Sequence, residues 1–154
     1  QSPFNAFQTL QGLETLPLRI ARHSENAQKV ADFLDSRREV AAVIHPSKQT
    51  GLSRERADKY LQGGFGGLVG FELKAGREAG RRFIDSLELF YHVANIGDAR
   101  SLAIHPATTT HSQLSSQDQL ASGVSEGYIR LSVGLEHISD ILADIDQALS
   151  RAAA

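Results

Sequence analysis

The sequence predicts an α+β fold of two layers, in which helices pack on one side of a small, mostly antiparallel or mixed sheet. Apolar residues recur at helical spacing near both ends of the chain, from residue 3 to about 36 and from 138 to 149. Between them, segments 67–74 and 128–135 alternate apolar and other residues, which is typical of strands with one buried face. A fully parallel sheet would bury both strand faces and lose this alternation.

The first helix is expected to begin after Ser2, which precedes a proline at the first helical position. Pro17 lies inside the helical pattern and should kink the helix or split it in two, because proline lacks the amide hydrogen that the helix needs. The apolar run 40–44 ends at His45-Pro46 and predicts a buried strand.

Short elements are expected in the rest of the chain. In order, they are a polar loop at 47–53, a helix at 54–61, a helix at 77–86, a strand at 89–93, an irregular stretch at 95–110 and a short helix before Gly123. Ser115 and Asp118 have the spacing of a capping box for the last of these helices.

Composition narrows the class of protein. With 154 residues, of which 41% are hydrophobic, the chain is long enough for one domain with its own core. The absence of cysteine excludes a disulfide scaffold, a zinc knuckle and a cysteine nucleophile. A net charge of −2 argues against a nucleic-acid partner, and no apolar run approaches the roughly 20 residues of a membrane span. Because the chain has no Met and starts at Gln1, we interpret it as a fragment of a larger protein, the parent.

Three motifs do not carry the chemistry that their letters suggest. Residues 123–127 read Gly-Val-Ser-Glu-Gly, but a nucleophile elbow needs a strand before the serine and a helix after it, and the predicted order is reversed. The glycines of 63–70 lack dinucleotide spacing and the lysine of a P-loop. The six histidines show no tight metal-binding spacing; His105 and His111 flank a threonine-rich loop.

Arg130 is the most informative single residue. In the strand pattern it shares a face with Ser132 and Gly134, so small neighbours leave space beside its guanidinium for a planar anion such as a carboxylate. The pattern alone favours the simpler interpretation, a solvated arginine on an exposed sheet face.

Several stretches resemble the Cys/Met-metabolism pyridoxal-phosphate (PLP) enzymes, in collinear order from Ser2 to Leu149. They are residues 2–6, 10–15, 83–87, 94–98, 101–102, 104–114 and 129–136. Within that family, Asn95-Ile96-Gly97 and Thr109-Thr110-His111 are most similar to the O-acetylhomoserine sulfhydrylase branch. The resemblance covers only the C-terminal part of such an enzyme, so it implies that residues 1–154 are a single C-terminal substrate-binding domain of a fold-type-I PLP enzyme.

The resemblance implies a role for three residues. Arg130 would bind the substrate α-carboxylate, Asn95 would offer its backbone N–H or side chain to the same group, and Thr110 would line the pocket wall. The parent reaction would be γ-replacement, in which sulfide or a thiol replaces acetate on O-acetylhomoserine to give homocysteine. No catalytic, cofactor-binding or metal-binding residue is expected in this chain.

The resemblance also implies what the chain lacks. The lysine that carries PLP and the loop that binds its phosphate would belong to the rest of the parent chain, because the four lysines, Lys29, Lys48, Lys59 and Lys74, have no matching context. The fragment would therefore be inactive and without cofactor. The parent would be a cytoplasmic homo-oligomer, expected to be a tetramer, with no membrane partner.

Two alternatives stay open. The chain could belong to a cystathionine γ-synthase or γ-lyase relative, or it could be a non-enzymatic domain that binds a small molecule or another protein. A parent of roughly three times this length would support the enzyme.

Overall fold

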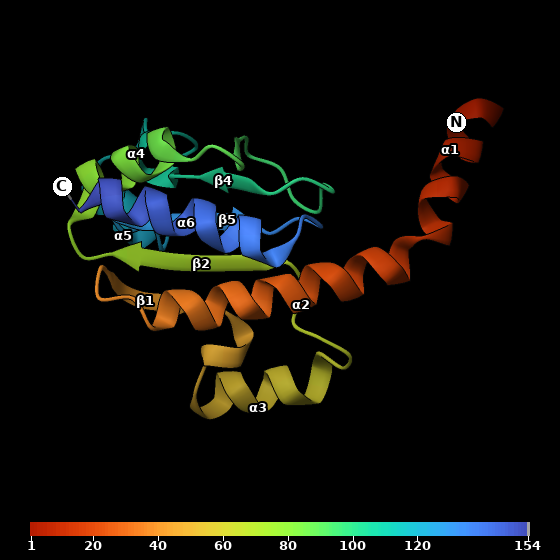
Figure 1. The fold of residues 1–154 in the computed structure, drawn as a ribbon, viewed down its shortest axis with the longest axis horizontal. Helices are drawn as coiled ribbons and strands as arrows, with labels where there is room; N and C mark the ends of the chain where they lie inside the picture. The colour runs from red at the N-terminus through yellow and green to blue at the C-terminus, as the bar shows by residue number, and fades with distance from the viewer. Residues whose placement is uncertain (154) are drawn as a thin grey trace.

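Five strands form one open, mixed sheet at the centre of the fold (Figure 1). The computed structural model describes residues 1–153. The strands lie in the order β1-β2-β5-β4-β3, and every neighbouring pair is antiparallel except β3 and β4. Their bounds are β1 Val40–Ile44, β2 Leu68–Leu73, β3 Tyr91–His92, β4 Leu102–Ile104 and β5 Tyr128–Ser132. The prediction of a mostly antiparallel or mixed sheet is confirmed.

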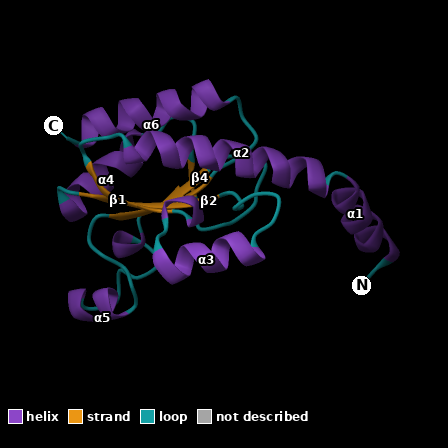
Figure 2. Ribbon diagram, turned by 90° about the horizontal axis from the view of Figure 1, so that it is seen from below, coloured by secondary structure: helices purple, strands orange, loops and turns teal. Residues whose placement is uncertain are grey.

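Three helices pack together on one face of this sheet and enclose the core (Figure 2). They are α2 (Leu16–Asp35), α4 (Gly76–Ser86) and α6 (Ile138–Ala152). The alternating residues of β2 and β5 point toward these helices, and Phe71 of β2 meets Phe83 of α4 edge to face, with ring centroids 5.3 Å apart. The predicted α+β class, with a core between the sheet and helices on one side, is confirmed.

Two shorter helices lie on the other side of the sheet (Figure 2). α3 (Gly51–Tyr60) follows the 3-10 turn η1 (Pro46–Lys48), and α5 (Ser116–Ala121) follows the turn η2 (Pro106–Thr108). The expected cap of α5 is present, since the Ser115 hydroxyl accepts from the Asp118 amide at 3.2 Å. α3 begins at Gly51, three residues before the helix that the sequence predicts, and Gly51 adopts φ +55° at this start, a conformation that glycine permits.

The N-terminal helical pattern is divided in two, as Pro17 predicts. α1 (Pro3–Glu14) is followed by its C-cap residue Thr15, and α2 begins at Leu16, so Pro17 lies in the first turn of α2, where proline is tolerated. α1 is capped by the Ser2 hydroxyl and projects away from the sheet without burying any of its residues (Figure 1).

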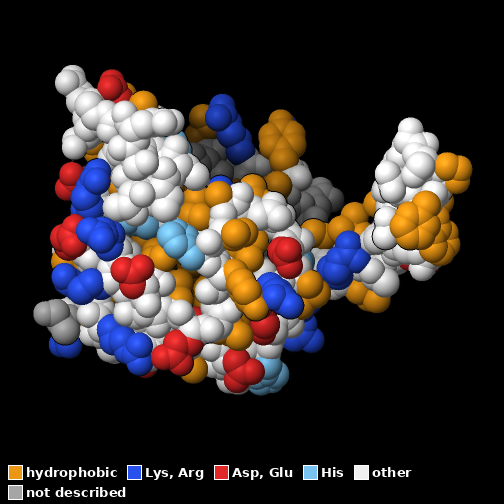
Figure 3. Space-filling model, turned by 90° about the horizontal axis from the view of Figure 1, so that it is seen from above, with side chains coloured by type: hydrophobic (Ala, Val, Ile, Leu, Met, Phe, Trp, Pro, Cys, Tyr) orange, Lys and Arg blue, Asp and Glu red, His pale blue; other side chains and the backbone are white. Residues whose placement is uncertain are grey.

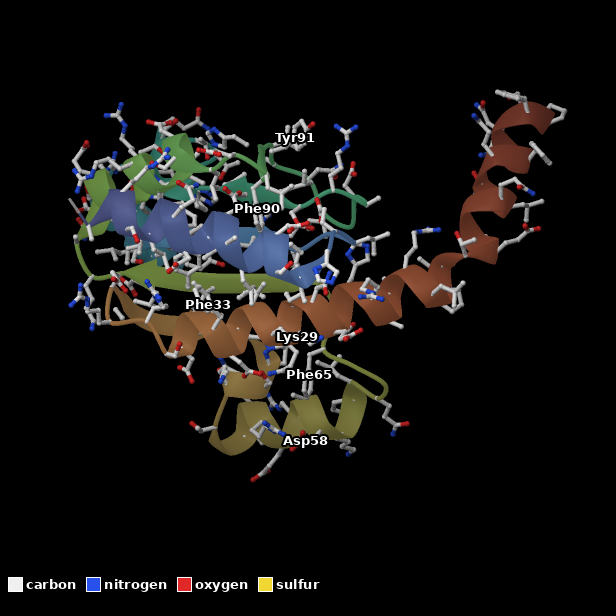
Figure 4. The ribbon with its side chains drawn as sticks, viewed as in Figure 1. Lys29, Phe33, Asp58, Phe65, Phe90 and Tyr91 are labelled. Carbon is white, nitrogen blue, oxygen red and sulfur yellow. The ribbon has the colours of Figure 1, made fainter. Side chains whose placement is uncertain are left out.

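Three strand predictions are wrong. β1 is an edge strand in which only Val40 is buried, whereas its apolar run predicts a buried strand; an apolar run does not say how many neighbours a strand has. The strand expected at 89–93 is reduced to Tyr91–His92, with Tyr91 exposed and pointing away from the body while Phe90 is buried (Figure 4). β4 lies inside the stretch predicted to be irregular, since three residues are too few to show a period.

No helix within residues 1–153 is both long enough and apolar enough to cross a membrane.

Candidate functional site

Arg130 lies at the centre of the sheet, on the face opposite the core helices. Its neighbours in β5, Ile129 and Leu131, are fully buried in the core, so the alternation of the strand directs Arg130 to the other face. Across the sheet, Arg130 is paired with Gly70 of β2 and Ile104 of β4. The alternation in the sequence therefore predicts its position correctly.

Tyr128 and Gly70 shape the space on one side of Arg130. A side-chain carbon on Gly70 would lie 2.7 Å from the Tyr128 hydroxyl oxygen, so the tyrosine ring occupies the room that glycine leaves. Burial raises the pKa of the Tyr128 phenol, although the positive charge of Arg130 opposes that shift. Tyr128 thus stays a neutral hydroxyl beside the guanidinium, and its place two residues before Arg130 is a signal that sequence reasoning missed.

The guanidinium of Arg130 is held from one side and has an unused donor. Its Nη2 donates to the backbone oxygen of Asn95 at 3.2 Å, whereas its Nε is buried and has no hydrogen-bond partner among the described residues. A buried N–H without an acceptor costs about 1–3 kcal/mol. The arrangement therefore fits an incoming anion that accepts from the guanidinium, as a carboxylate does.

Asn95 contacts Arg130 through its main chain. Its side-chain oxygen accepts from the Ile96 amide at 2.9 Å, which closes a local turn, and its backbone oxygen is the acceptor for Arg130. In the structure Asn95 therefore orients the arginine. Its direct contact with a substrate carboxylate stays a prediction.

Thr110 lies on the turn after η2, exposed, with its hydroxyl oxygen 2.9 Å from Nδ1 of His111. The described residues give no hydrogen bond between Thr110 and Arg130, and its place in a pocket wall stays a prediction. His105, in contrast, is a structural residue of this turn. It is fully buried, its Nε2 lies 2.8 Å from the Glu126 oxygen, and its Nδ1 lies 2.9 Å from the Thr108 hydroxyl.

The four lysines are all engaged in local contacts. Lys29 pairs with Glu25, Lys48 with Asp32 and Asp35, Lys59 lies over the Tyr60 ring, and Lys74 donates to the Arg38 oxygen. Within residues 1–153, no three His, Cys, Asp or Glu side chains gather where they could hold a metal ion. The donors at Arg130 fit a carboxylate.

The fold and this arginine define a class, an α+β domain with an arginine at the centre of the open face of its sheet. The comparisons with known proteins identify the family. Residues 1–150 match the model of the Cys/Met metabolism PLP-dependent enzymes, and the chain belongs to this family, whose members depend on PLP.

Individual relatives agree with this assignment. The chain is 56% identical to an O-acetyl-L-homoserine sulfhydrylase of Leptospira meyeri over 96% of this chain and 34% of that protein. It is 44% identical to an L-methionine gamma-lyase of Pseudomonas putida over 99% of this chain and 38% of that protein. The chain thus spans about a third of the length of these relatives.

A solved structure confirms the fold class. The crystal structure of a putative O-acetylhomoserine (thiol)-lyase of Campylobacter jejuni, which contains a pyridoxyl-lysine monophosphate, superimposes with a TM-score of 0.88. The two chains are 46% identical, and the match covers 96% of this chain and 35% of the other.

Proposed function

We propose that the chain is the C-terminal domain of a PLP-dependent O-acetylhomoserine sulfhydrylase and that it supplies the site for the substrate α-carboxylate. In the proposed reaction, acetate leaves the γ-carbon of O-acetylhomoserine, and sulfide or a thiol takes its place. The observation that carries the proposal is the buried Nε of Arg130, a charged donor without a partner among the described residues, on a guanidinium that the Asn95 oxygen holds. The sulfhydrylase names among the relatives and the segments Asn95-Ile96-Gly97 and Thr109-Thr110-His111 support this branch of the family.

PLP, when bound to the parent enzyme, supplies the electron sink for the chemistry at the substrate's amino-acid centre. The contribution of this chain is to bind and orient. Arg130 would form charge-assisted hydrogen bonds with the α-carboxylate and so fix the position of the α-carbon and of the γ-carbon beyond it. Tyr128 and Ile104 would form the sides of the site around Arg130, on the face of the sheet where Arg130 lies.

The rest of the parent chain would contribute the lysine and the phosphate loop that hold PLP, and the isolated chain would be inactive. We also propose that the parent is a cytoplasmic homo-oligomer, with a tetramer as the expected state. Thr110 would line the pocket wall.

Replacement of Arg130 in the full-length parent tests the proposal. Arg130→Lys keeps the charge but loses the planar fork, so part of a charged hydrogen bond of roughly 1.5–3 kcal/mol is lost. At about 1.4 kcal/mol per factor of ten, we expect kcat/KM for O-acetylhomoserine to fall about ten- to a hundredfold. Arg130→Ala should lower it further, because the carboxylate is left without a counter-ion.

Arg38→Ala is the matched control, since the Arg38 side chain is 94% exposed and Arg38 is distant from Arg130 in the sequence. Its kcat/KM should equal that of the wild type. If Arg130→Ala retained wild-type kcat/KM in a folded, PLP-loaded enzyme, the carboxylate role would be wrong.

The methionine gamma-lyase relative provides the second candidate, a lyase of the same family. Parallel assays of the parent separate the two functions. Homocysteine formed from O-acetylhomoserine and sulfide supports the sulfhydrylase. Faster release of a volatile thiol from methionine alone would favour the lyase.

A further inference from the structure

A short segment runs beside the end of β5 and carries the oxygen that holds Arg130. Residues 95–101 are attached to β5 and to the residues just after it at successive points. The Gly97 amide donates to the Ser132 hydroxyl at 3.0 Å, and the Leu135 amide donates to the Ala99 oxygen at 2.8 Å. Asn95 lies at the free end of this segment, where its backbone oxygen accepts from Arg130.

Glu136 closes the other end of the segment. One carboxylate oxygen accepts from the Ser101 amide at 2.7 Å, and the other accepts from the Ser101 hydroxyl at 2.9 Å. The Ser101 hydroxyl oxygen in turn accepts from the Gly134 amide at 2.9 Å. Ser101 is fully buried. Its amide and its hydroxyl are both hydrogen-bonded to Gly134 or Glu136, which follow Arg130 in the sequence.

Gly134 lies against residues 99–101 too closely to admit any larger side chain. A side-chain carbon on Gly134 would lie 2.5 Å from the Ser101 nitrogen and 2.6 Å from the Ala99 oxygen, so only glycine allows the two segments to approach this closely. From the helix layer, the fully buried Asn26 donates to the backbone oxygens of Gly134 and Glu136 at 3.0 Å each. The backbone that carries the Glu136 side chain is therefore held by residues 99–101 on one side and by Asn26 on the other.

We propose that Glu136 is a positioning residue of the substrate-carboxylate site, because its two hydrogen bonds to Ser101 fix the segment whose Asn95 oxygen aims the Arg130 guanidinium. The inference rests on the proposed function. Loss of this fixation would let the Asn95 oxygen move and the guanidinium turn. A displacement of about 1 Å in a binding group is enough to reduce the rate of an enzyme by a large factor.

The test uses the full-length, PLP-loaded parent with Glu136→Ala, Glu136→Gln, Arg130→Ala and the double variant Glu136→Ala/Arg130→Ala. The readouts are kcat and KM for O-acetylhomoserine, and the inhibition constant of L-2-aminobutyrate, an amino acid that has the carboxylate but no γ leaving group. We expect Glu136→Ala to raise KM and the inhibition constant about tenfold with a smaller change in kcat. Glu136→Gln keeps one acceptor for the Ser101 amide and should recover part of this loss.

The double variant distinguishes positioning from general destabilisation. If Glu136 acts through Arg130, the effect of Glu136→Ala on KM should disappear when Arg130 is already alanine, because residues that act in one network are not additive. Hydrogen exchange of residues 95–101 should become faster in Glu136→Ala while the core helices stay protected. Glu88→Ala is the control, as its exposed carboxylate pairs only with Arg151 among the described residues.

Each outcome has a defined meaning. Equal effects of Glu136→Ala in both backgrounds, or an unchanged KM in a folded Glu136→Ala and Glu136→Gln, would overturn the positioning role and leave the proposed function intact. An unchanged KM in Arg130→Ala would overturn the proposed function itself, and this inference with it.

Discussion

At the scale of single residues, two buried histidines lie at the start of two different turns. His45 and His105 each precede a proline that begins a 3-10 turn. The His45 Nδ1 accepts from the Ser47 amide at 3.3 Å, and the His105 Nδ1 lies 2.9 Å from the Thr108 hydroxyl. Both imidazoles are at most 1% exposed, and burial lowers the pKa of each below its usual value of 6.5.

These lowered pKa values predict that the chain loses stability in mild acid. The unfolded chain takes up protons near pH 6.5, while the folded chain resists, so the free energy of unfolding should decrease as the pH falls below 6.5. Each histidine contributes at most about 1.4 kcal/mol per pH unit until its folded pKa is reached. Urea denaturation between pH 7.5 and 5 measures this slope. His45→Asn keeps an acceptor for the Ser47 amide but does not titrate, so it should reduce the slope.

His137→Asn is the matched control, because His137 is exposed and its Nδ1 accepts from the Ser139 amide in the same geometry. Its slope should equal that of the wild type. A slope unchanged in His45→Asn would show that the buried imidazole does not contribute.

At the scale of secondary-structure elements, one carboxylate on α6 holds the segment between α4 and β3. Asp144 is 6% exposed and accepts from three consecutive amides, those of Glu88, Leu89 and Phe90, at 2.8, 2.9 and 3.2 Å. Within residues 1–153 these residues pair with no strand, so the side chain replaces the hydrogen bonds that a longer β3 would provide. This is a physical reason why the strand expected at 89–93 contains only two residues.

We therefore expect Asp144→Ala to destabilise the fold by about 3 kcal/mol, since it leaves three amides without their charged acceptor. Asp144→Asn keeps one carbonyl oxygen and should lose less. Asp140→Ala, in the exposed first turn of the same helix, should change stability by less than about 1 kcal/mol. Thermal or urea unfolding measures all three, and equal losses at 140 and 144 would contradict the role of Asp144.

The sequence predicted those elements that are long enough to show the apolar spacing of a helix or a strand. α6, β2 and β5 repeat their apolar residues at the spacing of their structure, and the face of Arg130 follows directly from β5. β4 has three residues, and the exposure of β1 follows from its place at the sheet edge. The Asn95 oxygen that holds Arg130 depends on a contact across 35 residues, which no local pattern contains.

At the scale of the whole molecule, α1 does not belong to the packed body. Phe4, Phe7, Leu10 and Leu13 are each more than half exposed, and no residue of α1 is buried. Apolar side chains gather on the projecting arm (Figure 3). The relatives are about three times as long as this chain, so in a parent of that length further protein is available to cover this helix.

The isolated chain should therefore self-associate through α1. Exposed apolar surface of this extent drives association in water, because its contact with another apolar surface removes it from solvent. Light scattering and sedimentation over a range of concentrations should show species larger than 16.7 kDa. Replacing Phe4, Phe7, Leu10 and Leu13 by Ser should shift the chain toward the monomer without changing the core, since none of the four contributes to it.

Leu120→Ser is the control, because Leu120 is 63% exposed but lies on α5, away from the arm, and this change should leave association as it is. A clean wild-type monomer at high concentration would show that α1 is tolerated in water, and equal relief by the α1 and Leu120 variants would show that association does not depend on α1.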